Sequence, residues 1–201
     1  MNIGVIALQG AVSEHIEALK RALSELKMEG KVLPIRRKKD FEQVNGLIIP
    51  GGESTTISKL LDKSGISGFI KEKAEEGMPI MGTCAGCILL AKEGDEEVEN
   101  SETKLLSLMD MKVIRNAFGR QRESFEITLD IKGFENPYKA VFIRAPAIEK
   151  VWGKCEALAS FNDKIVLAKQ ENLVACAFHP ELTHDTRIHR LLLKMIMKSD
   201  F

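Results

Sequence analysis

The pentapeptide GTCAG, residues 82–86, places a cysteine between small residues in a pattern that suits a nucleophile. It joins the apolar run PIMGT to the apolar run AGCILL, so we expect Cys84 on a tight turn between a strand and a helix. Glycines two positions before and after the cysteine avoid clashes in such a strained turn. The following helix N-terminus favours the thiolate, and the N–H of Ala85 can point at a developing oxyanion. The alternative is a buried cysteine beside an ordinary turn.

A histidine and a glutamate at the end of another apolar run can complete this chemistry. The segment LVACAFHPEL, residues 173–182, contains His179 and Glu181, which point to the same side of an extended chain. The carboxylate can orient the imidazole, and the histidine lies at the same sheet edge as the cysteine. We predict a triad in which Cys84 is the nucleophile, His179 the general acid/base and Glu181 the orienting group. The alternative is a strand-end histidine beside a surface glutamate.

The segment PGGES, residues 50–54, follows a third apolar run, GLII. Two consecutive glycines let the backbone approach a ligand closely, so Gly51 or Gly52 can supply an oxyanion N–H. The carboxylate of Glu53 can recognise an α-amino group. Taken alone, the segment also fits a turn and a helix cap with Ser54 as the capping residue. It matches neither of the common glycine-rich phosphate-binding motifs.

Arginines near the apolar runs are candidates for binding a substrate carboxylate. Arg115, Arg120 and Arg122 lie in RNAFGRQRESFE, residues 115–126, and Arg144 follows the run VFI. A guanidinium group suits a carboxylate ligand and equally suits a structural ion pair. From the residues alone, the ion-pair interpretation is preferred.

The other cysteines and the histidines have plainer interpretations. Cys84 and Cys87 form a C-x-x-C pair, which can indicate redox chemistry, but Cys87 lies in an apolar helix and is better explained as a packed thiol. No second ligand pair has the spacing of a zinc site, and we expect neither metal nor cofactor. The remaining expectations are core positions for Cys155 and Cys176, a structural role for His15, and surface or partner-facing positions for His184 and His189.

The candidate residues require a sheet whose strand ends meet at one edge, and the first half of the chain predicts such a sheet. Apolar, β-branched runs alternate there with amphipathic segments, which is typical of parallel strands covered by helices on both faces. We expect strands at 3–8, 32–36, 46–50 and 79–83, and helices at 12–26, from Ser54, at 69–77 and at 85–93.

The second half is richer in strands. Residues 94–104 are acidic and lack periodicity, so we expect an exposed loop there, and residues 185–197 predict a final amphipathic helix. We therefore predict an α/β fold with three layers, a mainly parallel or mixed sheet flanked by helices, and an antiparallel extension. We expect one domain over residues 1–201.

The composition limits the class of partner. The chain has 29 basic and 29 acidic residues among 201, so it offers no general attraction to nucleic acid. It contains no apolar run of roughly 18 residues, the length needed to span a membrane. The N-terminal MNIGVIALQG lacks the basic start of a signal peptide, and we expect a cytoplasmic protein with a small-molecule substrate.

Six segments between residues 3 and 182 resemble the class I (triad) glutamine amidotransferases. Within that class they are most similar to the glutaminase subunits of pyridoxal 5′-phosphate synthase, the PdxT/SNO family. Three strings, ALQGA, PGGESTT and FGRQRESFE, are distinctive of the narrower family, whereas the cysteine elbow and HPE are shared more widely. The six segments are GVIALQGAVSEH, GLIIPGGESTTISKLL, PIMGTCAGCILLAK, RNAFGRQRESFE, VFIRAPAI and FHPEL.

The resemblance implies a flavodoxin-like fold and the hydrolysis of L-glutamine to L-glutamate and ammonia. It places Cys84, His179 and Glu181 in the family's triad positions. It also implies that Gly52 and Ala85 form the oxyanion hole. The glutamine contacts that it implies are Gly51, Gly52, Glu53, Arg115, Ile143 and Arg144.

The same resemblance implies a protein partner. A barrel-shaped, PdxS-type synthase subunit would receive the ammonia through a tunnel and use ribose 5-phosphate and glyceraldehyde 3-phosphate for vitamin B6 biosynthesis. The family works as a complex of twelve glutaminase and twelve synthase subunits. Its members suggest activation by the partner through reorientation of the Gly51–Gly52 peptide.

Two rival functions remain at this stage. A cysteine-dependent hydrolase of the same broad fold, such as a peptidase or a deglycase-like enzyme, would use the same elbow on another substrate. The strings PGGES and FGRQRESFE argue against it. A binding or regulatory module with a degraded site is the non-enzymatic alternative, and the intact set of cysteine, histidine and glutamate argues against that.

Overall fold

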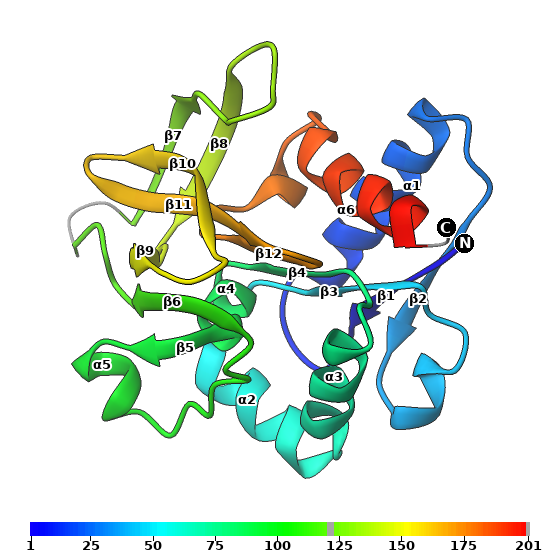
Figure 1. Cartoon of the computed structure of the whole chain (residues 1–201), viewed down its shortest axis with the longest axis horizontal. Helices are drawn as coiled ribbons and strands as arrows, with labels where there is room; N and C mark the ends of the chain where they lie inside the picture. Colours follow the sequence, from blue (N-terminus) through cyan, green and yellow to red (C-terminus); the bar gives the residue numbers. More distant parts are fainter. Residues whose placement is uncertain (120–122, 200–201) are drawn as a thin grey trace.

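The structure is a computed structural model, and it describes residues 1–119 and 123–199. Within these residues, a ten-stranded mixed sheet lies between two groups of helices, and a separate two-stranded sheet stands beside it (Figure 1). The predicted three-layer α/β architecture with an antiparallel extension is confirmed. No helix in the described part of the chain has the length and apolar character needed to cross a membrane.

The parallel half of the large sheet has the strand order β2–β1–β3–β4–β12, with each strand parallel to its neighbours. Every residue of β3, β4 and β12 is buried, which explains their continuous apolar sequences. Pro34, which has no N–H to donate, lies on the edge strand β2. These strands are β1 (Asn2–Ile6), β2 (Lys31–Ile35), β3 (Gly46–Ile49), β4 (Ile80–Thr83) and β12 (Leu173–Cys176).

The antiparallel half continues from β12 through β11, β9 and β6, and β10 pairs with β11. The short strand β5 is parallel to β6 at the far edge. A hairpin of β7 and β8 forms the separate sheet, which projects from the rest of the molecule in Figure 1. The bounds are β5 (Ala91–Gly94), β6 (Met109–Ile114), β7 (Ser124–Leu129), β8 (Tyr138–Ile143), β9 (Ala147–Val151), β10 (Glu156–Phe161) and β11 (Lys164–Gln170).

Two apolar cores lie on opposite faces of the sheet. Leu47 and Ile49 of β3 pack with α2, α3 and α4, whereas Ile48 packs with α1 and α6, as the two-residue period of a strand requires. The helices are α1 (Val12–Glu25), α2 (Ser54–Lys63), α3 (Ile66–Glu75), α4 (Ala85–Leu90), α5 (Glu96–Glu99) and α6 (Arg187–Ser199), with 3₁₀ turns η1 (Lys38–Phe41) and η2 (Pro180–Leu182).

Two expectations about residues 85–104 were wrong. The helix expected at 85–93 ends at Leu90, because the chain becomes extended at Ala91 and β5 pairs with β6. The acidic segment is not a plain loop, since it contains α5. The Asp95 carboxylate accepts the N–H of Val98, and Val98 is buried, so a side-chain cap and one apolar anchor stabilise this short helix.

Candidate active site

The carboxyl ends of four adjacent parallel strands meet at one edge of the sheet and carry the candidate residues. Gln9 follows β1, the Gly51–Glu53 segment follows β3, Cys84 follows β4, and His179 follows β12. These strands are neighbours in the order β1–β3–β4–β12. Segments far apart in the sequence therefore converge, as is usual for ligand sites of open α/β sheets.

Cys84 has the strained backbone of a nucleophile elbow, with φ 49° and ψ −103°. Its two flanking glycines are sterically required. A Cβ at Gly82 would lie 2.4 Å from the carbonyl oxygen of Gly86, and a Cβ at Gly86 would lie 2.1 Å from the carbonyl oxygen of Ile49. The backbone N–H of Cys84 donates to the carbonyl of Cys176 on the neighbouring strand, which holds the turn against the sheet.

His179 contacts both of its predicted partners. Its Nδ1 lies 2.7 Å from Glu181 Oε1, and its ring also hydrogen-bonds with the Cys84 side chain. Burial alone would lower the pKa of His179, but the hydrogen bonds to Cys84 and Glu181 and the charges of both groups raise it to about 10. An imidazolium beside the sulfur stabilises the thiolate, the reactive form of cysteine. Glu181 itself is buried behind the histidine.

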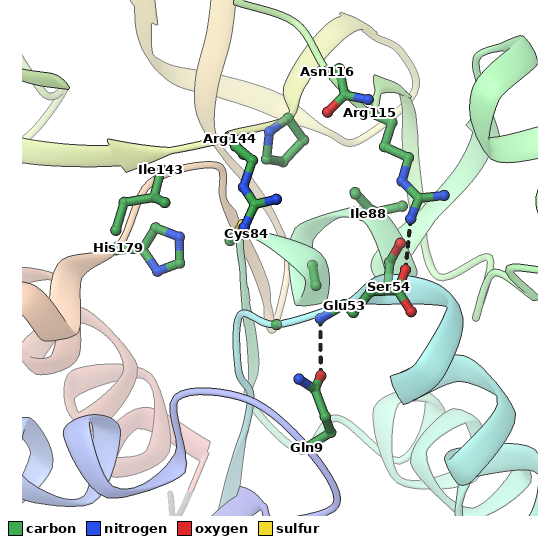
Figure 2. A pocket seen from close by; sticks show the side chains of 13 residues that line it. Gln9, Glu53, Ser54, Cys84, Ile88, Arg115, Asn116, Ile143, Arg144 and His179 are labelled. Carbon is green, nitrogen blue, oxygen red and sulfur yellow. Dashed lines mark hydrogen bonds and ion pairs between the residues drawn. The ribbon is translucent and has the colours of Figure 1, made fainter. Parts of the chain in front are cut away.

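A cavity of about 430 Å³ opens in front of Cys84 and His179, a volume in the usual range for small-molecule sites (Figure 2). Most of the residues expected to bind substrate line it. Gly51 is not among the lining residues, but it lies beside His179, since a Cβ there would approach the imidazole ring to 2.8 Å. The lining residues are Gln9, Gly52, Glu53, Ser54, Cys84, Ala85, Ile88, Arg115, Asn116, Ile143, Arg144, Pro146 and His179.

Glu53, rather than Ser54, caps α2. Its carboxylate accepts the N–H groups of Thr55 and Thr56, and it also lies 2.7 Å from the guanidinium of Arg115. Partial burial opposes ionisation, but the hydrogen bonds from Thr56 and Thr55 and the charge of Arg115 lower the pKa of Glu53 to about 2. The group is therefore a permanent anion at the pocket wall, suited to an α-ammonium group.

Ile143 and Arg144 lie at the end of β8 on the opposite side of the pocket, and Figure 2 shows both near His179 and Cys84. Arg144 has φ 39°, an unfavourable value for a residue with a side chain. Its N–H donates to the carbonyl of Glu123, which holds this backbone in place. Arg120 and Arg122, the other predicted basic candidates, lie outside the described residues.

The oxyanion candidates face the same cavity. Ala85 is the first residue of α4, so its N–H belongs to the helical turn whose N–H groups have no acceptor within the helix. Gly52 has φ 156°, and the carbonyl of the preceding Gly51 accepts the N–H of Ala11. A hydrogen bond from Ala11 thus holds the carbonyl side of the peptide between the two glycines.

Gln9 was not predicted as a site residue. Its Oε1 accepts the N–H of Glu53 at 2.9 Å, so it links the β1 loop to the segment after β3 (Figure 2). A Cβ at Gly10 would lie 1.9 Å from the carbonyl oxygen of Gly51, so the β1 loop packs directly on that segment. The string ALQGA, which contains Gln9 and lies at the end of the first strand, was the sequence signal that could have indicated this residue.

Three expectations about side chains outside the pocket differ in outcome. Cys87 is fully buried, and burial raises the pKa of its thiol well above the usual value, which fits a packed thiol rather than a redox partner. His184 is exposed as expected, but the surface position expected for His189 was wrong. His189 is fully buried because α6 packs against α1, where His189 Nε2 lies 3.0 Å from His15 Nδ1.

Comparisons with known proteins show the family to which the chain belongs. A model of the SNO glutamine amidotransferase family matches residues 5–198. A pyridoxal 5′-phosphate synthase subunit PdxT of Archaeoglobus fulgidus is 55% identical to this chain, and the match covers 97% of the chain and 98% of the relative. A PdxT subunit of Methanosarcina barkeri is 51% identical, with 99% and 100% covered.

Solved structures show the same fold. A structure described as a glutamine amidotransferase superposes with a TM-score of 0.86 at 43% identity, covering 97% of this chain and 98% of the other. The PurLQS structure from Thermotoga maritima has a TM-score of 0.65 at 14% identity over 100% of this chain and 98% of that one, a similarity of fold alone.

Proposed function

Because this chain belongs to the SNO glutamine amidotransferase family, we propose that it hydrolyses the side-chain amide of L-glutamine as the glutaminase subunit of a pyridoxal 5′-phosphate synthase. Glutamate is released, and the ammonia passes to a synthase subunit. The observation that carries this proposal is the contact of His179 with both Cys84 and Glu181 at the floor of a pocket whose walls carry both charges.

His179 takes up the proton of the Cys84 thiol before glutamine binds, so the reaction starts from a thiolate and an imidazolium. The thiolate attacks the amide carbon of glutamine, and the N–H groups of Gly52 and Ala85 stabilise the oxyanion. His179 gives the proton to the amide nitrogen, the carbon–nitrogen bond breaks, and ammonia leaves. His179 then takes a proton from water, which attacks the thioester, and the carbon–sulfur bond breaks to release glutamate.

The remaining pocket residues bind the amino-acid end of glutamine. The carboxylate of Glu53 pairs with the α-ammonium group, and Arg115, next to it, lies within reach of the α-carboxylate. Ile143 and Arg144 close the opposite wall. This arrangement distinguishes glutamine from an internal residue of a peptide, which has neither terminal charge, and therefore favours a glutaminase over the rival peptidase.

The partner in this proposal is a PdxS-type barrel subunit that uses ribose 5-phosphate and glyceraldehyde 3-phosphate, in a cytoplasmic complex of twelve subunits of each kind. The names of the PdxT relatives support a synthase partner. The glutaminase subunit is one domain over residues 1–201, and it needs no nucleic acid, membrane, metal or cofactor.

Partner binding activates the subunit by turning the Gly51–Gly52 peptide, so that its N–H faces the oxyanion. Glycine permits this rotation, and the hydrogen bond from Ala11 to the Gly51 carbonyl is the contact that the rotation breaks. The docked synthase must compensate for that loss.

The first experiment measures ammonia release from glutamine by the chain alone and with a PdxS-type subunit. We expect release to rise with the partner and to vanish in Cys84→Ala, while Cys87→Ala, which removes a buried thiol, retains activity. Equal release by Cys84→Ala and the wild type would refute the mechanism. Cleavage of peptides without cleavage of glutamine would favour the rival hydrolase.

A further inference from the structure

The carboxylate of Glu181 has a second oxygen that the triad does not use. Oε1 faces His179, whereas Oε2 is buried and makes no well-directed hydrogen bond within the described residues. His15 Nε2 lies 3.4 Å from this oxygen. Burying a carboxylate oxygen without a hydrogen-bond donor costs free energy. A proton on His15 Nε2 would therefore help to stabilise the negative charge of Glu181.

His15 comes from α1 and reaches the back of the triad. Its side chain is fully buried, its Nε2 lies 2.9 Å from Thr83 Oγ1, and its Nδ1 lies 3.0 Å from His189 Nε2. Thr83 immediately precedes Cys84, so the histidine bridges the nucleophile turn and the triad carboxylate. Burial, together with the nearby His189 and His179, keeps the pKa of His15 well below its usual value, so the ring is neutral.

A neutral ring carries one proton, and the surroundings decide which nitrogen holds it. With the proton on Nε2, the N–H donates to Thr83 Oγ1, and this positive end of the ring lies 3.4 Å from Glu181 Oε2. Nδ1 then accepts a hydrogen bond from His189 Nε2. Nδ1 of His189 has no hydrogen-bond partner among the described residues, and in this state it carries a lone pair rather than a proton.

The other tautomer is worse at both ends. With the proton on His15 Nδ1, a lone pair on Nε2 would face the carboxylate at 3.4 Å. His189 would have to accept at Nε2 and carry its proton on Nδ1, which is buried without an acceptor. Arg21 lies close enough to disfavour a charged His189, and burial lowers the pKa of His189 to about 3, so double protonation does not relieve the conflict.

We propose that His15 is a positioning residue for the triad, held by His189 as the Nε2–H tautomer so that its N–H end supports the ionised Glu181. The inference rests on the proposed function. Glu181 in turn stabilises the imidazolium of His179, and the imidazolium stabilises the Cys84 thiolate. Loss of the donor at Nε2 therefore weakens the support of the His179 imidazolium and slows the chemical step, without changing the pocket that binds glutamine.

Two substitutions at position 15 separate this role from simple packing. The amide nitrogen of Gln reaches the place of Nε2, whereas that of Asn reaches only the place of Nδ1. We expect His15→Asn to lower kcat for ammonia release about tenfold, because the buried charge of Glu181 loses the polar N–H end beside it, with KM unchanged. We expect His15→Gln to retain most of the wild-type kcat. His184→Gln, at an exposed histidine, is the control.

A second readout needs neither glutamine nor the synthase. Iodoacetamide alkylation of Cys84, located by mass spectrometry, should slow at pH 7 in His15→Asn and converge with the wild type at alkaline pH. Absence of ammonia release by the wild type would count against the proposed function alone, since alkylation still tests His15. Equal behaviour of the Asn and Gln variants, or wild-type behaviour of both, would overturn the inference.

The tautomer itself can be read in the unsubstituted protein if the variants do not fold. Nitrogen-15 NMR of the histidine-labelled chain should show the His15 proton on Nε2 and a bare Nδ1. A proton on Nδ1 would overturn the inference.

Discussion

The pocket wall that faces solvent and the region behind His179 both hold ionisable side chains, but in different environments. Glu53 and Arg115 form an ion pair whose side chains are 47% and 25% exposed. Behind His179, the side chains of Glu181 and His15 are fully buried, and His189 is as well. Water screens the first pair, whereas protein groups alone surround the second set.

This difference assigns different tasks to the two regions. A partly exposed ion pair is weak, so a ligand that carries opposite charges can compete for both of its members. A buried carboxylate and two neutral histidines have no water to replace a lost hydrogen bond, so each proton has one acceptable place. The solvent side can therefore exchange partners with substrate, while the buried side keeps its hydrogen bonds behind His179 in one arrangement.

The strongest test replaces a carboxylate by the isosteric amide on the buried side, at Glu181. Glu181→Gln should lower kcat roughly 1000-fold with KM nearly unchanged, because the amide no longer stabilises the imidazolium of His179. Ammonia release over a range of glutamine concentrations measures both constants. A loss confined to KM would mean that Glu181 acts on binding, and would remove the distinction between the two regions.

The matched change on the solvent side is Glu53→Gln. We expect KM for glutamine to rise about tenfold while kcat is retained, because the ion pair between this partly exposed carboxylate and the α-ammonium group is lost. With its pKa near 2, Glu53 stays ionised throughout pH 5–9 and adds no pH dependence to binding in that range. Glu126→Gln, on the β7–β8 hairpin, is the control and should resemble the wild type. A kcat loss as large as that of Glu181→Gln would contradict the comparison.

A smaller effect concerns stability in acid. The folded-state pKa of His189 is about 3, so below about pH 6.5 the unfolded chain binds a proton that the folded chain does not. The stability from this group is complete above pH 6.5 and is lost as the pH falls towards 3. Urea unfolding at pH 7.5 and 5.5 should show His189→Gln losing about 1 kcal/mol less stability than the wild type over this interval. Parallel losses would show that His189 is not buried in its neutral form.

Local patterns were sufficient to propose the triad because its geometry is largely local. An elbow needs small residues at fixed offsets from Cys84, and an extended chain places His179 and Glu181 on one side, so residue types and spacing carry the information. The parallel strands were predictable for the same reason, since each is a short apolar run between turns. The early end of α4 was not predictable, because pairing of β5 with β6 stops an otherwise apolar helix.

The amino-acid sequence by itself determined the candidate nucleophile, its candidate acid/base partner, the parallel half of the sheet and the glycine-rich segment beside it. Only the tertiary structure decided what stands behind and around them. His15 and His189 are 174 residues apart, and Gln9 and Glu53 are 44 apart, so no local pattern reports their contacts. The packing of α1 and α6 against the strand ends buries both histidines behind the triad. Burial removes contact with bulk water, so the protein groups around each proton decide which acceptor it has.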